Sequence, residues 1–241
     1  MTTTPVEVRG GVELPASRRD VELHTSDGLT LVGELSVPLD RPPVATLLAL
    51  HPLPTAGGFM DSHIIRKAAA RLPAQAGVAV LRFNFRGVSS PRGRSEGSFG
   101  EGITEAADLA AAVSLLAAEP LPRPWLMGWS FGTEVALKHG LDHDIEGAIL
   151  LSPPLHRTTE AELGAWSRSG KTLVAVIPEF DDYLRPEEAR QRFAVVPEAN
   201  VIDIPGGKHL WVGETQTREV LTEVVRVVAP AALPLGDTWP A

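Results

Sequence analysis

The feature that most constrains the fold of this chain is the alternation of short apolar runs with helical patterns. The runs at 44–50 and 78–85 are typical of strands buried on both faces. Amphipathic patterns at 100–119 and 215–230 predict helices that follow such runs. Strands that alternate with helices form a mostly parallel sheet with helices on both faces. We therefore predict an α/β fold.

The N-terminal part of the chain departs from this alternation. Two alternating apolar runs within 20–38 flank a Ser-Asp-Gly turn and predict a hairpin, which adds an antiparallel edge to the sheet. We place a single domain at 19–229, with a loose lead-in at 1–18 and a proline-rich tail at 230–241. The tail, which carries Trp239, is expected either to be loosely ordered or to dock on a neighbouring molecule.

Composition narrows the classes of function. The net charge of −8 and the lack of a Lys/Arg-rich stretch argue against nucleic-acid binding. The sequence contains no cysteine, which excludes disulfides, thiolate metal sites and cysteine catalysis. No apolar run reaches the roughly 20 residues that a membrane span needs, and the first residues lack the apolar core of a signal peptide. We expect a cytoplasmic protein that acts on a small molecule and binds no membrane.

A serine between two glycines is the first candidate for chemistry. Ser130 lies in the motif GWSFG, directly after a predicted strand and before a predicted helix. Gly128 and Gly132 leave room for the tight turn that presents a nucleophilic serine at the end of a strand. The alternative interpretation is a serine in an ordinary glycine-rich turn.

A nucleophilic serine needs a base and an acid that orients the base. His209 follows the last predicted strand after a short glycine loop, and the alternative is an ordinary surface histidine. The loop after the preceding strand offers Asp181 and Asp182, and we favour Asp181. One of these two residues is alternatively a cap of the following helix. The chain order Ser130, Asp181, His209 is the order expected for this kind of turn.

The same chemistry needs two N–H groups to bind an oxyanion. One is expected from Phe131, the residue after the serine. The loop at 51–61 should supply the other, and between Pro52 and Pro54 only Leu53 has an N–H. We expect His51 to support this loop rather than to titrate in catalysis.

These motifs resemble those of the α/β-hydrolase superfamily, in particular its small bacterial serine hydrolases. The matching stretches are HPLP, GGFMD, RFNFRGV, GWSFG, EFDDYLRP and GGKHLW. The resemblance covers about residues 20–228 and implies an eight-stranded sheet, a Ser130–Asp181–His209 triad and cleavage of a carboxylic ester or related acyl bond. It implies no metal and no organic cofactor. Leu53 stands where the family more often has a second histidine.

The short connection at 153–170 leaves room for only a minimal cap, so the site should be open. We expect a small, largely apolar substrate that contacts Trp129, Phe59, Leu155 and Trp211, although each of these residues is alternatively part of the core. We assign no arginine to the substrate, because Arg86 is expected to brace its own loop. The rival functions are a thioesterase, an amidase or a carbon–carbon hydrolase with the same triad, a non-catalytic binding module, and a structural subunit. The oligomeric state cannot be read from this sequence.

Overall fold

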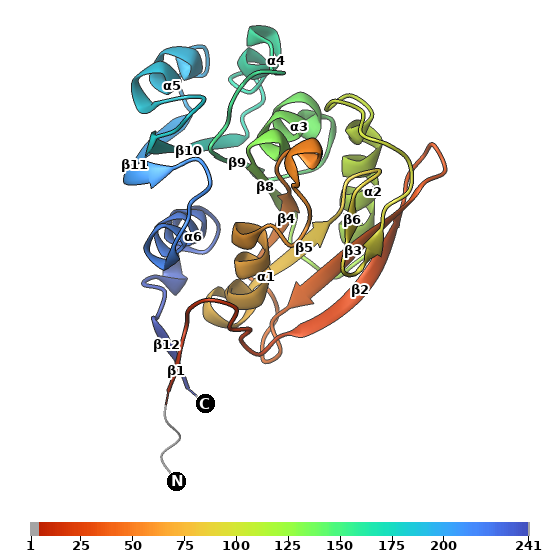
Figure 1. Ribbon diagram of the computed structural model, residues 1–241, viewed down its shortest axis with the longest axis vertical. Coiled ribbons are helices and arrows are strands. Elements are labelled where there is room, and N and C mark those ends of the chain that lie inside the picture. Colours follow the sequence, from red (N-terminus) through yellow and green to blue (C-terminus); the bar gives the residue numbers. More distant parts are fainter. Residues whose placement is uncertain (1–4, 241) are drawn as a thin grey trace.

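The centre of the computed structural model, which describes residues 5–240, is an eight-stranded sheet with the order β11-β10-β9-β8-β4-β5-β3-β2 (Figure 1). β3 pairs antiparallel with both β2 and β5, and every other pairing in this sheet is parallel. The predicted mostly parallel sheet with an antiparallel N-terminal edge is therefore confirmed. Its strands are β2 (Ser17–His24), β3 (Thr30–Val37), β4 (Ala45–Leu50), β5 (Val78–Phe83), β8 (Pro124–Trp129), β9 (Gly147–Leu151), β10 (Thr172–Phe180) and β11 (Asn200–Lys208).

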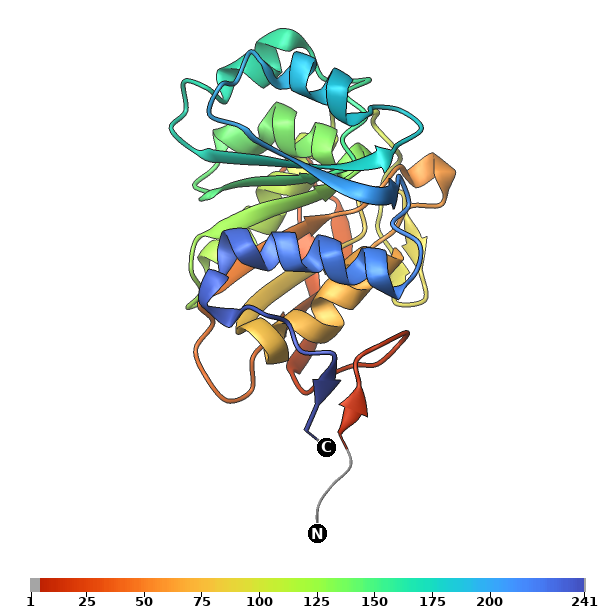
Figure 2. The same ribbon diagram turned by 90° about the vertical axis from the view of Figure 1, so that its left-hand side faces the viewer.

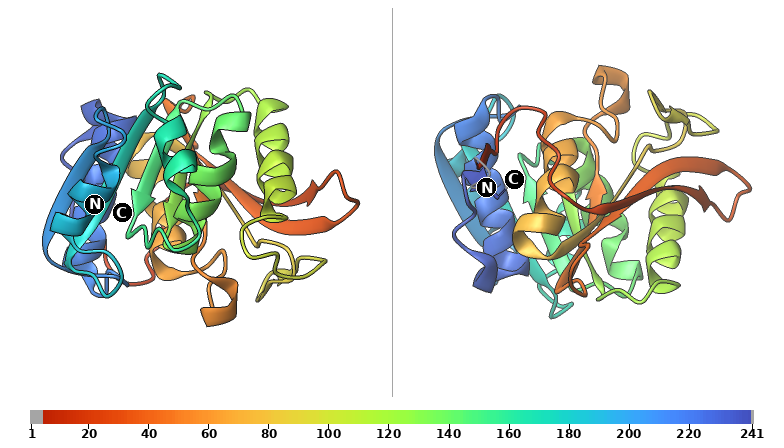
Figure 3. Two further views of the ribbon diagram at one scale, coloured as in Figure 1. Left: turned by 90° about the horizontal axis from the view of Figure 1, so that it is seen from above. Right: turned by 90° about the horizontal axis from the view of Figure 1, so that it is seen from below.

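Helices cover both faces of this sheet. α1 (His63–Ala76) and α6 (Glu214–Val228) share one apolar core with the sheet and lie side by side in Figure 2. The other core holds residues of α2 (Glu105–Ala117), α3 (Phe131–His139), α4 (Glu160–Ala165) and α5 (Pro186–Phe193). All residues of β4, β5 and β9 are buried, as expected of strands covered on both faces. Figure 3 shows the hairpin of β2 and β3 at the edge opposite β10 and β11.

The helix predicted at 100–119 begins only at Glu105. The carboxylate of Glu105 accepts hydrogen bonds from the N–H groups of Gly100 and Gly102, each at 2.8 Å. These bonds hold the preceding residues in turns, so the first part of the predicted helix is not helical. The smaller elements are β6 (Ser89–Ser90), β7 (Gly93–Arg94) and the 3₁₀ turns at Pro54–Ala56, Gly140–Asp142 and Pro230–Ala232.

Segments near the two ends of the chain pair with each other, which corrects the prediction of a loose lead-in and of a tail that is loosely ordered or docks on a neighbouring molecule. β1 (Val6–Glu7) runs antiparallel to β12 (Thr238–Trp239), and the two strands lie side by side in Figure 1. Val8 and Leu14 are buried against α1 in a small apolar cluster to which Trp239 packs. The tail therefore docks on its own chain. Residues 1–4 of the lead-in and residue 241 of the tail lie outside the described residues.

The connection between β9 and β10 contains only the short helix α4, so the predicted minimal cap is confirmed. A reciprocal pair of hydrogen bonds between Thr159 and Glu162 defines the start of this helix. Within residues 5–240, no helix is long and apolar enough to cross a membrane.

Candidate active site

Ser130 lies at the carboxyl end of β8, in a turn that only glycine neighbours permit. Its backbone has φ 51° and ψ −117°, a conformation that costs a non-glycine residue about 1–3 kcal/mol. A Cβ on Gly128 would lie 2.6 Å from the backbone of Gly132, and a Cβ on Gly132 would lie 2.1 Å from the carbonyl oxygen of Leu50. The motif GWSFG thus packs the start of α3 directly onto β4 and leaves the serine hydroxyl at the turn.

Three polar side chains form one continuous chain of hydrogen-bond contacts. Ser130 Oγ lies 3.0 Å from His209 Nε2. His209 Nδ1 lies 3.1 Å from Oδ1 and 3.0 Å from Oδ2 of Asp181. Asp181 and His209 are buried, whereas Ser130 is partly exposed. The structure therefore brings together the serine, base and acid expected from the sequence, with the serine facing solvent.

The choice between the two aspartates follows from the loop after β10. Asp181 Oδ1 accepts hydrogen bonds from the N–H groups of Tyr183 at 2.8 Å and Leu184 at 3.2 Å, which fixes the carboxylate toward His209. Asp182 is exposed. Neither aspartate caps α5, because the N-cap of that helix is Arg185, whose side chain makes no capping hydrogen bond.

Backbone contacts also hold His209 in place. Its carbonyl oxygen accepts hydrogen bonds from Trp129 Nε1 and Ser152 Oγ, each at 3.2 Å. The ring of Tyr183 contacts the imidazole edge-on, with 4.6 Å between the ring centres. The histidine is therefore positioned by the ends of β8, β9 and β10, and not by its own loop alone.

Two backbone N–H groups remain unused beside the serine. Within residues 5–240, neither Leu53 N–H nor Phe131 N–H has a hydrogen-bond acceptor. Phe131 is the first residue of α3, where helix geometry leaves the N–H without a partner. Both residues line the same cavity as Ser130. Backbone N–H groups without an acceptor beside a serine are one requirement of a site that binds an oxyanion.

His51 braces the loop that carries Leu53, as expected. Its Nε2 accepts the N–H of Phe85 at 3.0 Å, and its Nδ1 donates to the carbonyl oxygen of Pro52 at 2.7 Å. Burial lowers the pKa of His51 to about 4, so the ring is neutral near pH 7 and can make both bonds. The carbonyl of Leu53 then accepts from Ala56 and Gly58, which closes the turn.

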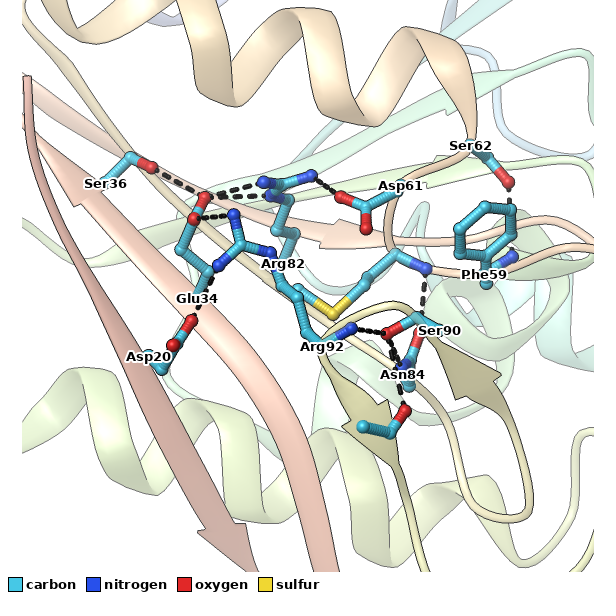
Figure 4. A network of polar contacts seen from close by, with 12 residues as sticks. Asp20, Glu34, Ser36, Phe59, Asp61, Ser62, Arg82, Asn84, Ser90 and Arg92 are labelled. Atoms are coloured by element: carbon cyan, nitrogen blue, oxygen red, sulfur yellow. Dashed lines mark hydrogen bonds and ion pairs between the residues drawn. The ribbon is translucent and has the colours of Figure 1, made fainter.

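A buried polar network anchors the far end of the same loop (Figure 4). Asn84 Oδ1 accepts the N–H of Met60 at 2.9 Å, and Arg82 pairs with Asp61. Arg82 also contacts Glu34 of β3 at 2.7 Å, which ties the loop to the antiparallel edge of the sheet. The stretch RFNF at 82–85 therefore holds both ends of the loop at 51–61, through His51 at one end and through Met60 and Asp61 at the other.

A cavity of about 290 Å³ opens above Ser130. Of the four apolar residues expected to contact substrate, only Trp129 lines it. Trp211 is fully buried in the core beneath α6, and Leu155 is buried in the opposite core. Phe59 lines a separate hollow beside Arg86. Three of these four assignments are corrected, because Leu155 and Trp211 are buried in the core and Phe59 lines a different hollow.

The cavity also contains polar residues that the sequence analysis missed. They are His63, Glu134, His156, Arg157 and Tyr183. His156 and Arg157 follow β9 by a few residues, so the position of a residue after a strand was the signal that could have found them. Arg86 instead contacts Asp108 at 2.8 Å and Asp27 at 2.9 Å, which agrees with its expected bracing role. In the described part of the chain, no group of three or more His, Asp or Glu side chains is arranged to hold a metal ion.

The chain belongs to the alpha/beta hydrolase family, which it matches over residues 47–239. Its structure is similar to that of XC6422 from Xanthomonas campestris, described as an α/β serine hydrolase without a lid. The TM-score is 0.74 at 25% identity, over 90% of this chain and 98% of that one. The esterase Pf2001 of Pyrococcus furiosus shares the fold, with a TM-score of 0.66 at 22% identity over 90% and 92% of the two chains.

One relative is also similar in sequence. It is an uncharacterized protein of Rickettsia prowazekii (strain Madrid E), 32% identical over 112 residues. The match spans 45% of each chain, so it covers less than half the length of that relative. The chain therefore shares the family and the fold of a lidless α/β serine hydrolase.

Proposed function

We propose that this protein is a serine hydrolase that cleaves the carboxylic ester, or a related acyl bond, of a small substrate through an acyl-enzyme. The observation that carries the proposal is the unbroken chain from Ser130 Oγ through His209 to Asp181, at the floor of an open cavity. A binding module would not need a serine in a strained backbone conformation against a histidine that a buried carboxylate orients.

The first half of the reaction forms the acyl-enzyme. Ser130 Oγ attacks the acyl carbon while its proton passes to His209 Nε2. Asp181 accepts the hydrogen bond of Nδ1–H and stabilises the imidazolium. The developing oxyanion accepts hydrogen bonds from the N–H groups of Leu53 and Phe131. When the tetrahedral intermediate collapses, the proton on Nε2 goes to the leaving group and an acyl bond to Ser130 remains.

The second half uses the same groups with water. His209 takes a proton from the water molecule, whose oxygen attacks the acyl carbon, and then returns a proton to Ser130 Oγ as the bond to the enzyme breaks. The products are a carboxylic acid and, for an ester, an alcohol. The apolar part of the substrate would contact Trp129, Leu53 and Ala56 in the cavity. Thioesters, amides and carbon–carbon bonds remain rivals that comparison of acyl donors separates.

The direct test is labelling with a fluorophosphonate probe, read by intact mass. We expect one adduct per chain, located on the peptide that contains Ser130 and lost in Ser130→Ala and His209→Ala. Ser26→Ala is the matched control, because Ser26 is exposed in the turn between β2 and β3. A folded protein that takes no label over a range of pH would refute the proposal, and an adduct that survives in Ser130→Ala would place the nucleophile elsewhere.

A further inference from the structure

Arg157 brings a permanent positive charge into the cavity that contains Ser130. It follows β9 in the connection that replaces a larger cap. Its guanidinium carbon lies 5.8 Å from the ring centre of Phe131, the residue next to the serine. The aromatic ring stabilises the guanidinium group, and Arg157 lines the same cavity as Ser130.

The hydrogen bonds of Arg157 leave part of its guanidinium unused. Nη1 contacts Glu134 Oε2 at 3.4 Å, and the other oxygen of Glu134 accepts the backbone N–H of Arg157. Within residues 5–240, Nε and Nη2 have no acceptor. The side chain of Arg157 is 33% exposed, whereas that of Glu134 is 0% exposed. Glu134 therefore contacts the backbone and Nη1 of Arg157, and the N–H groups of Nε and Nη2 remain free for a ligand in the cavity.

Two further ionisable groups of the cavity, His63 and Glu134, do not compete for this role. Burial lowers the pKa of His63, so that ring is neutral near pH 7. Glu134 is the only carboxylate that lines the cavity within the described residues, and its two oxygens are already occupied. A negatively charged group entering from solvent thus meets the guanidinium before it meets the buried carboxylate.

We infer that Arg157 binds a carboxylate carried by the substrate apart from the bond that is cleaved. This inference rests on the proposed function and specifies its substrate class, namely esters that retain one free carboxylate. An arginine with two adjacent free N–H donors matches a carboxylate, because both groups are planar and form parallel hydrogen bonds. The carboxylate lies either on the acyl part or on the alcohol part of the ester.

The test compares charged esters with neutral esters of the same shape. Monomethyl glutarate and methyl 5-methylhexanoate form the pair with the difference on the acyl part. 3-Acetoxypropanoate and 3-methylbutyl acetate form the pair with the difference on the alcohol part. Hydrolysis is followed by proton NMR. We expect the wild-type protein to prefer the charged member of at least one pair in kcat/KM, and the pair that shows the preference identifies the part that contacts Arg157.

Variants of Arg157 connect the preference to the side chain. Arg157→Met keeps the aliphatic stem and is expected to lower kcat/KM for the preferred charged ester about 10- to 100-fold, mainly through KM. The neutral partner should change less than about threefold. Arg157→Lys keeps the charge without the planar fork and should recover part of the loss. Thermal unfolding of each variant shows whether the contact with Glu134 is needed for the fold.

Two results would overturn the inference. The first is equal kcat/KM of the wild-type protein for both members of each pair. The second is an equal loss of kcat/KM for charged and neutral esters in Arg157→Met, which would mean that Arg157 only stabilises the segment after β9. If no ester is hydrolysed, calorimetry with monomethyl glutarate and 3-acetoxypropanoate decides separately. We expect at least one of these two esters to bind to Ser130→Ala and not to bind to Ser130→Ala/Arg157→Met. The role of Arg157 would be refuted if the double variant still bound the ester, or if Ser130→Ala bound neither ester.

Discussion

Replacing Leu53 with proline would remove the N–H that we propose as an oxyanion donor, together with the leucine side chain. Leu53 has φ −53° and ψ 118° and precedes Pro54. These angles are within the range that a proline adopts at position 53. The N–H that is lost has no acceptor within residues 5–240, so no hydrogen bond of the folded state is broken.

The expected magnitude follows from that geometry. Since the N–H makes no bond in the folded protein, its contribution arises when charge develops on the substrate oxygen. Removing one such donor costs about 2.7–4 kcal/mol of transition-state stabilisation, which is about 10²–10³ in kcat. Compared with Leu53→Ala, which loses the same side chain from the core, the free energy of unfolding should be unchanged or slightly higher, because proline restricts the unfolded chain.

The assay is steady-state hydrolysis of a short ester by wild type, Leu53→Pro and Leu53→Ala. Leu53→Ala is the matched control, since it removes the same apolar contact with the cavity but keeps the N–H. We expect Leu53→Pro to fall far below Leu53→Ala in kcat. If both variants lose the same activity while both remain folded by thermal unfolding, the N–H of Leu53 is not an oxyanion donor and the reasoning is wrong.

Three further predictions concern stability. Gly132→Ala should lower the free energy of unfolding in urea by about 3 kcal/mol or more, because its Cβ would lie 2.1 Å from a β4 carbonyl oxygen. The control Gly11→Ala, which has open space around its Cβ, should change this free energy by less than about 0.5 kcal/mol. Equal effects of the two substitutions would contradict the close packing at Gly132. Asn84→Ala should lower the free energy of unfolding in urea by about 1–3 kcal/mol, because the buried N–H of Met60 loses its acceptor. An unchanged midpoint of urea unfolding would show that this network does not hold the loop at 51–61. Burial lowers the pKa of His51 to about 4, so the unfolded chain takes up this proton first as the pH falls. The contribution of His51 is fully present well above pH 6.5 and is lost as the pH falls through 6.5 toward 4, with about 2 kcal/mol lost by pH 5. His51→Gln should therefore show a flatter decline of stability with pH than wild type, and parallel profiles would refute the assignment.

The predictions from sequence were most accurate where the evidence was local or periodic. The buried apolar runs became strands, and the patterns between them became helices, because burial of an apolar face is decided by residues close in sequence. GWSFG predicted its turn for the same reason, since two glycines and a serine set the backbone there. The missed start of α2 arose from side-chain bonds of Glu105 to glycine N–H groups, which compete with helix formation.

The apolar runs and the GWSFG motif were enough to predict the class of fold, the turn that holds Ser130 and the carboxyl ends of the strands as the location of the site. Which loop side chains enter that site depends on the tertiary structure. It turned Asp181 toward His209, buried Trp211 in the core and directed Arg157 into the cavity. It also joined β1 to β12 across the whole length of the chain. The direction of a loop side chain depends on contacts with segments far away in sequence, and such contacts leave no periodic pattern from which they could be predicted.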